Sequence, residues 1–330
     1  MTRKDPMIIH PLKALSELYL QEKTLSESSM KSYRIVYKHF TIFLAKHGIQ
    51  YATTADIIAY RTDMRELGSS TYNIYIHISA IKGLYHYLKQ NQKRLNLPIE
   101  YAYDVAAAIQ NERIKRALRK PILTPEQARH MILHTQANRK YLWEYRDHAI
   151  VYIMITAGLK VHEVIHARKA DYVMLDQCPI LYIHNIEKKG QPDYVKLTKG
   201  TQKALDDYLN LRQDDNPYLF IAHKKPAQYG YLSRMFFMHM FRTLLKRCGL
   251  EDTGVTPHCL RHTAAALNLL RGGSVEVTKQ LMRHVNIQST LIYKDYLERL
   301  ADDSENQIEA FILKEDGLTA YEAFIDYLDR

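Results

Sequence analysis

The last quarter of the chain holds a tyrosine, two histidines and an arginine at spacings that could support chemistry on a phosphate. His258 and Arg261, in "TPHCLRHT", are three residues apart and project from one face of a helical turn. His284 follows Arg261 by 23 residues, and Tyr293 follows His284 by nine. An arginine fork binds two oxygens of a phosphate, histidines donate hydrogen bonds, and a tyrosine hydroxyl could attack phosphorus.

Each of these residues also has an ordinary explanation. The chain has 25 tyrosines, so most of them must be packing residues. Tyr293 and Tyr296 could both cover the edge of an apolar helix stripe near Leu291 and Ile292. A His-x-x-Arg pair alone is typical of a solvated basic turn. A nucleophilic tyrosine therefore needs support from other parts of the chain.

The elements that must position these residues are mostly helical. Residues 256–293 predict a helix, a Gly-Gly break, a second helix, an Arg-His turn and a helix that carries Tyr293. Upstream, three- and four-residue apolar steps predict helices over 30–48, 53–68 and 69–91. The exception is 178–198, where β-branched and aromatic residues flank "KKGQP" and predict a hairpin with Lys188 and Lys189 at its turn.

Charge divides the chain into segments. The net charge is +10, which indicates a polyanionic partner. Residues 1–117 carry 17 Lys/Arg against 10 Asp/Glu, residues 118–300 carry 27 against 17, and the last thirty residues carry 2 against 9. We expect two bodies that face DNA and an acidic tail with a different task.

A length of 330 residues also favours two domains. The basic, weakly apolar stretch around Pro121 ends at a Thr-Pro-Glu helix start, so it is interpreted as a linker. We predict a helical domain over 1–112, a linker over 113–123, a second domain over 124–303 and a tail over 304–330. Arg119 and Lys120, in the linker, are candidate DNA contacts.

Composition limits the other possibilities. No apolar run reaches the length of a membrane span, and charged residues interrupt the N-terminal apolar stretch, unlike in a signal peptide. The three cysteines lack metal-ligand spacing and fit a reducing compartment, so we expect a cytoplasmic protein. The sequence shows no carboxylate cluster of a two-metal nuclease, and we expect no metal or other cofactor.

The order and spacing from His258 to Tyr293 resemble the tyrosine recombinase (phage integrase) family. Its C-terminal signature is His-x-x-Arg-His, then Leu-Gly-His, then a tyrosine nine residues on, which here is Tyr293 rather than Tyr296. "ITAGLKVHEVIHARKADYV" (155–173) is similar to the family's Thr-Gly-Leu-Arg segment, and the Lys-Lys-Gly hairpin is similar to its catalytic-lysine turn. The resemblance covers roughly residues 10 to 300.

The resemblance implies a role for each matching residue. Tyr293 would form a covalent 3′-phosphotyrosine, and Arg261 with His258 and His284 would stabilise the phosphate. Lys189 would protonate the departing 5′-oxygen as general acid. Lys160 occupies the place of the family's first arginine, and Glu163 would orient its neighbours. Lys188 and Arg283 are candidate DNA contacts.

Two departures from the family pattern stand out. Lys160 offers a point charge where the family has an arginine fork, which predicts slower cleavage. Arg283 stands where the family has the glycine of Leu-Gly-His.

The implied architecture is mainly α with a small antiparallel β-sheet or hairpin. A helical, SAM-like core-binding domain and a catalytic domain would form a C-shaped clamp on DNA. About ten residues precede the first predicted helix, which favours the simpler, Xer-like class that acts on core sites alone. The expected partners are double-stranded DNA with inverted half-sites and three further copies in a synaptic homotetramer.

The expected reaction is site-specific recombination, for integration or excision of a mobile element or for dimer resolution. Two alternatives stay open: a catalytically impaired DNA-binding protein of the same fold, and a type IB topoisomerase-like nicking-closing enzyme. The tail places Ile308, Phe311 and Ile312 on one apolar stripe, and Tyr321, Phe324, Ile325 and Leu328 on another. We expect it to dock on a neighbouring protomer, and packing on its own domain is the alternative.

Overall fold

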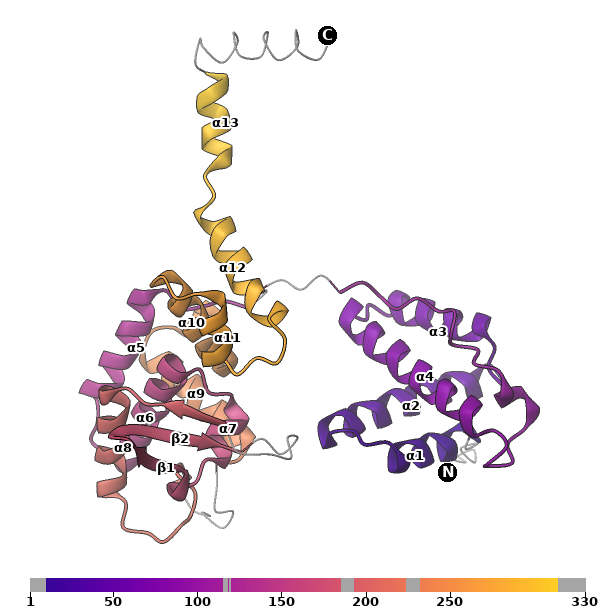
Figure 1. Ribbon diagram of the computed structural model, residues 1–330, viewed down its shortest axis with the longest axis horizontal. Helices are drawn as coiled ribbons and strands as arrows, with labels where there is room; N and C mark the ends of the chain where they lie inside the picture. The colour runs from indigo at the N-terminus through magenta and orange to yellow at the C-terminus, as the bar shows by residue number, and fades with distance from the viewer. Residues whose placement is uncertain (1–9, 115–117, 119, 185–192, 224–231, 314–330) are drawn as a thin grey trace, which may run out of the picture. The chain divides into compact units, whose positions relative to one another are not determined.

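The computed structural model describes residues 10–114, 118, 120–184, 193–223 and 232–313. The chain forms two compact units, Met1–Arg116 and Ala117–Arg330 (Figure 1). Each unit has its own hydrophobic core.

Unit 1 is helical throughout its described part. Its elements are α1 (Leu12–Glu22), α2 (Glu27–Lys46), α3 (Thr54–Glu66), α4 (Thr71–Asn91) and the short 3-10 helix η1 (Ile99–Ala102). The side chains of Ser26, Thr53 and Ser70 each accept a hydrogen bond from a backbone N–H in the first turn of the helix that follows. The three predicted helices are confirmed, and α2 begins earlier than predicted because Ser26 caps it.

Unit 2 packs its helices around a buried one. The elements are α5 (Pro125–Ala137), α6 (Leu142–Ala157), α7 (Val161–His166), η2 (Lys169–Asp171), α8 (Lys199–Leu211), α9 (Arg234–Arg247), η4 (Glu251–Thr253), α10 (Pro257–Leu270), α11 (Val275–Leu281), α12 (Gln288–Ala301) and α13 (Ser304–Ile312). Helix α6 packs against α5, α8 and α10, and most of its side chains are buried. Helix α6 is therefore part of the core, although it also buries the charged residues Glu144, Arg146 and Asp147.

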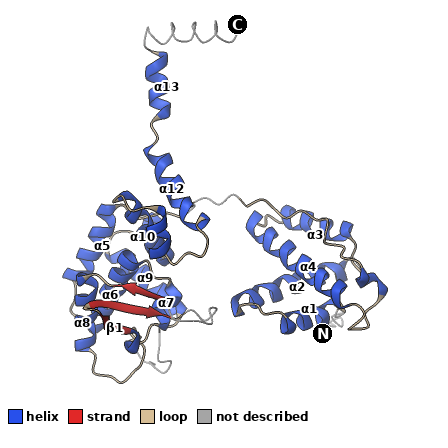
Figure 2. Ribbon diagram, viewed as in Figure 1, coloured by secondary structure: helices blue, strands red, loops and turns tan. Residues whose placement is uncertain are grey.

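The small sheet of unit 2 is antiparallel and has the order β1-β2-β3 (Figure 2). Its strands are β1 (Tyr172–Leu175), β2 (Cys178–Ile183) and β3 (Asp193–Lys196). In the register, Val173 lies opposite Ile180, and Leu181 lies opposite Val195. The hairpin strands β2 and β3 are confirmed, whereas β1 was not predicted.

The fold class is therefore confirmed as mainly helical with a small antiparallel sheet. The linker prediction of 113–123 overlaps the boundary between the two units at Arg116. Within the described ranges, no helix is both long and apolar enough to cross a membrane.

Candidate active site

Three helices of unit 2 enclose the tyrosine singled out by the sequence. Helices α10, α11 and α12 pack against one another, and Ala264, Ala265, Met282 and Tyr293 form a small buried cluster between them. Tyr293 lies on α12 and is 2% exposed, while Tyr296 on the same helix is half-buried. The two tyrosines thus differ in surroundings as well as in register.

The hydroxyl of Tyr293 contacts a histidine from α10. Its oxygen lies 2.6 Å from Nδ1 of His262. Burial lowers the pKa of His262 to about 4 and raises the pKa of Tyr293 to about 12, although nearby Arg261 opposes the second shift. At neutral pH both groups are therefore uncharged, and the phenol is the donor of this hydrogen bond in the tautomer of His262 that leaves Nδ1 unprotonated.

Arg261 is held by backbone carbonyls. The residue is 5% exposed, and its guanidinium donates hydrogen bonds to the carbonyl oxygens of Gly158 and Met282. These residues cap α6 and α11, and the C-terminal end of a helix presents unpaired carbonyls and partial negative charge. Burial, and secondly Arg283, lower the pKa of Arg261 to about 10.

Gly158 makes this arrangement possible. It ends α6 in the left-handed conformation, with φ +59°, and an added Cβ would lie 2.9 Å from the sulfur of Met282. An added methyl would force the Met282 side chain to shift beside the helix ends that hold Arg261. The glycine in "ITAGLKV" is thus favoured chiefly by its backbone conformation, and its close packing adds to the preference.

Glu163 joins two of the cations that the sequence indicated. Its carboxylate lies 2.7 Å from Nη2 of Arg283 and 3.7 Å from Nζ of Lys160, and it also accepts the Lys160 backbone N–H at 2.8 Å. Its predicted orienting role stays a prediction, but its contacts suit that role.

The remaining predicted residues lie around this group. His284 accepts or donates a hydrogen bond with the Thr290 hydroxyl at 2.9 Å, and its ring lies parallel to that of Tyr293 with centroids 6.4 Å apart. Burial lowers the pKa of His258, and the charges of Lys120, Arg234, Arg261 and Lys160 lower it further, which places those cations nearby. Burial also lowers the pKa of His284 to about 4.

The structure thus brings together eight of the predicted residues: Lys120, Lys160, Glu163, His258, Arg261, Arg283, His284 and Tyr293. Arg119, Lys188 and Lys189 lie outside the described residues. His262 was not proposed, although it is the last residue of the His-x-x-Arg-His signature in "TPHCLRHT", so its signal was visible.

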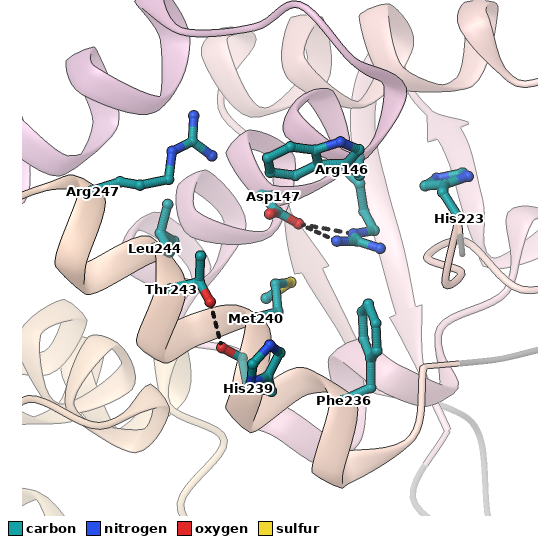
Figure 3. A pocket seen from close by; sticks show the side chains of 10 residues that line it. Arg146, Asp147, His223, Phe236, His239, Met240, Thr243, Leu244 and Arg247 are labelled. Atoms are coloured by element: carbon teal, nitrogen blue, oxygen red, sulfur yellow. Dashed lines mark hydrogen bonds and ion pairs between the residues drawn. The ribbon is translucent and has the colours of Figure 1, made fainter. Parts of the chain in front are cut away.

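Unit 2 also has a cavity elsewhere, between α6 and α9 (Figure 3). Figure 3 shows Arg146 in it, paired with Asp147 at 2.6 Å. Phe236 and Trp143 lie under the guanidinium groups of Arg146 and Arg247, respectively. In the described part of the chain, no group of three or more His, Cys, Asp or Glu side chains could hold a metal ion.

Comparison with known proteins gives a consistent result. The sequence model of the phage integrase family matches residues 121–299, and the model of the phage integrase N-terminal SAM-like domain matches residues 13–92. The chain is 33% identical over 159 residues to the tyrosine recombinase XerD of Brucella suis. It is 24% identical over 306 residues to the tyrosine recombinase XerD of Rhizobium meliloti.

The extent of these matches differs. The first covers 46% of this chain and 49% of the Brucella protein, so the chain spans about half the length of that relative. The second covers 89% of this chain and 94% of the Rhizobium protein. Among solved structures, XerH site-specific recombinase bound to a palindromic difH substrate, in a post-cleavage complex, is similar with a TM-score of 0.67 at 16% identity, over 88% of this chain and 84% of that one.

Proposed function

The chain belongs to the phage integrase family, and on that premise we propose that it is a tyrosine recombinase, which cleaves and rejoins duplex DNA at a specific site. The observation that carries the proposal is the convergence of buried Tyr293 and Arg261 with half-buried His262 and His284 in unit 2. A phenol beside neutral histidines and an arginine suits nucleophilic attack on a phosphodiester.

In the proposed reaction, the Tyr293 oxygen forms a bond to the scissile phosphorus, and the bond from phosphorus to the 5′-oxygen breaks. The phenolic proton passes to Nδ1 of His262, which lies 2.6 Å from the phenol oxygen and accepts the proton in the tautomer that leaves Nδ1 free. Lys189 protonates the departing 5′-oxygen. Reversal with a new 5′-hydroxyl rejoins the strand, so the bond energy is kept in the phosphotyrosine and no cofactor enters the scheme.

Charge stabilisation is the task of the surrounding cations. Arg261 faces the developing negative charge on the phosphate, and His258 and His284 add hydrogen-bond donors. Lys120, Lys188 and Arg119 contact the DNA backbone, where a positive charge suffices.

The first test compares two tyrosines on one helix. Tyr293→Phe should abolish the covalent DNA adduct on a denaturing gel and leave site binding intact, whereas Tyr296→Phe should still form the adduct. A suicide substrate nicked beside the cleavage site traps the adduct. Trapping on one site only indicates a recombinase, relaxation of any supercoil indicates a topoisomerase, and no adduct in the unchanged chain indicates a DNA-binding protein.

The role of Lys189 is testable through the leaving group. Sulfur in place of the bridging 5′-oxygen leaves without a proton. Lys189→Ala should therefore cleave normal DNA poorly and the sulfur substrate well. If sulfur gives no rescue, Lys189 is not the acid, and Lys188→Ala is the next variant to measure.

Both units would contribute to DNA binding, as a clamp over inverted half-sites. Each unit carries an excess of Lys/Arg in its sequence. Affinity should fall by roughly 10³-fold or more between about 50 and 200 mM salt if about six phosphates are neutralised. A flat salt dependence would contradict this part of the proposal.

We further propose that the acidic tail docks on a neighbouring protomer in a homotetramer. Helix α13 has no buried residue, and its apolar side chains Ile308, Phe311 and Ile312 are all more than half exposed. An exposed apolar stripe favours a partner over packing on its own unit. Deleting 304–330 should preserve half-site binding by a monomer and remove cooperative filling of the second half-site; unchanged cooperativity would sink the idea.

A further inference from the structure

Arg283 has a backbone conformation that arginine rarely adopts. Its φ is +52°, in the left-handed region that favours glycine, and the family motif has glycine at this place. A bulky residue persists in such a conformation when its side chain makes compensating contacts. The question is what this guanidinium does.

The side chain of Arg283 turns back into the site instead of extending into solvent. It is 6% exposed, and it donates to Glu163 at 2.7 Å and to the carbonyl oxygens of Leu281, Gly158 and Ala157 at 3.0, 3.3 and 3.4 Å. Gly158 is also the carbonyl that holds Arg261. The two guanidinium groups therefore meet at one oxygen at the end of α6.

Lys160 interacts with Glu163 more weakly than Arg283 does. Its side chain is 46% exposed, and its ammonium lies 3.7 Å from Glu163, whereas Arg283 lies 2.7 Å from the other carboxylate oxygen. An ammonium lacks the planar fork that fits two phosphate oxygens. The buried guanidinium beside Glu163 thus comes from position 283 and not from position 160.

The local charges are unbalanced. Lys160, Arg261 and Arg283 are positive, and Lys160 and Arg283 share one carboxylate, that of Glu163, as their ion-pair partner. Arg261 is satisfied by carbonyls alone, and Nε of Arg283 is buried without a hydrogen-bond partner among the described residues. Such an arrangement is stabilised by an anion that arrives from outside, and the proposed phosphate is one.

We propose that Arg283 supplies the second guanidinium of the catalytic site, in place of the arginine that is absent at position 160. This rests on the proposed recombinase function and deepens it. Arg261 and Arg283 together stabilise the charge of the scissile phosphate, while Glu163 and the end of α6 hold Arg283 in place. Lys160 is then an accessory charge, so its lysine does not by itself slow the enzyme.

A four-protein cycle tests the exchange: the unchanged chain, Arg283→Gly, Lys160→Arg and the double variant. Adduct formation is measured in single turnovers at saturating protein. We expect Arg283→Gly to cleave about 10- to 100-fold more slowly, Lys160→Arg to change the rate by less than about 3-fold, and the double variant to recover most of the loss. Arg283→Lys keeps the charge and should lose less than Arg283→Gly.

A neutral substrate separates a charge role from a folding defect. A methylphosphonate at the scissile position removes one negative oxygen, so Arg283→Gly should cleave it nearly as fast as the unchanged chain does. Equal loss on both substrates, or no loss on normal DNA, overturns the inference while the Tyr293 adduct of the unchanged chain still supports the proposed function. Absence of any adduct in the unchanged chain overturns the proposed function itself.

Discussion

The two units bury different kinds of side chain. In the described part of unit 1, the buried polar residues are His10, Ser16, Thr41 and His77, and none is an arginine or a carboxylate. Unit 2 buries Glu144, Arg146, Asp147, Asp171, Arg212 and Arg261. Because a buried charge costs free energy unless it is paired, unit 2 must compensate each charge, and the way it does so separates scaffold from site.

The arginines of unit 2 illustrate that separation. Arg146 pairs with Asp147 at 2.6 Å, and Arg212 pairs with Asp214 at 2.5 Å. Arg261 instead bonds to two carbonyls, which carry no full charge. The arginines paired with a carboxylate stabilise the fold, whereas the arginine of the candidate site is held by carbonyls and is the one that we propose binds an anion.

The largest expected effect on folding comes from breaking a paired arginine. Arg146→Met leaves Asp147 buried and unpaired, so unfolding should become easier by about 3–5 kcal/mol. Urea unfolding followed by far-UV circular dichroism measures the change. Adding Asp147→Leu should restore most of the stability, and a double variant as unstable as the single one would show that packing, not charge, is responsible.

Arg261→Gln should affect cleavage strongly and stability weakly, in contrast to Arg146→Met. Cleavage should fall by about 10²- to 10³-fold, since one donor to the developing charge is lost. Burial disfavours the charge of Arg261 in the folded state and lowers its pKa to about 10, which offsets part of the cost of losing its two hydrogen bonds to carbonyls, so Arg261→Gln should destabilise the fold less than Arg146→Met does. If Arg261→Gln destabilises the fold as much as Arg146→Met does, the two arginines do not differ in their contribution to folding, and this prediction is wrong.

Acid should weaken unit 2 more than unit 1. Burial lowers the pKa of His148, His223, His262 and His284 in unit 2 to about 4, whereas in the described part of unit 1 it does so for His77 alone. An unfolded histidine titrates near 6.5, so below that pH the unfolded chain binds more protons and stability declines down to about pH 4.

The single tryptophan, Trp143, reports on unit 2 alone, whereas circular dichroism reports on the helices of both units. Between pH 7 and 4.5, the urea midpoint of unit 2, followed by Trp143 fluorescence, should fall. If circular dichroism shows a second transition, which belongs to unit 1, the midpoint of that transition should fall by less. Equal shifts would mean that the histidines of unit 2 are not kept neutral by the fold.

The smallest expected effect comes from Gly158→Ala. A side chain at φ +59° costs about 1–2 kcal/mol, and contact with Met282 adds to the strain. Cleavage by the folded variant should also slow, because the carbonyl of residue 158 holds Arg261 and would shift with the backbone. The loss of cleavage should therefore exceed the loss that a smaller folded fraction explains. Thermal melts and adduct rates on the same variant compare the two, with Gly272→Ala, which meets no neighbouring atom, as the control.

Sequence reasoning located the helices because their apolar residues repeat at the helical period, and it predicted a candidate site because four motif positions fall in register. Strand β1 was not predicted from the sequence, since none of its four residues is buried and its turn uses Asp176 and Gln177 at positive φ without a glycine. The burial of Tyr293 and the path of Arg283 depend on how α6, α11 and α12 pack, which no local pattern encodes. These long-range contacts had to be observed.

The burial of Tyr293 bears on how such a protein searches a chromosome. Sequence-independent phosphate contacts let a basic protein slide along DNA and sample very many sites that it must not cut. With its hydroxyl 2.6 Å from His262 and the residue only 2% exposed, the proposed nucleophile would be withheld from each of these passing phosphodiesters. In the proposed recombinase, the packing of α12 would limit damage during the search, and target fidelity would depend on what loosens that helix as well as on base recognition.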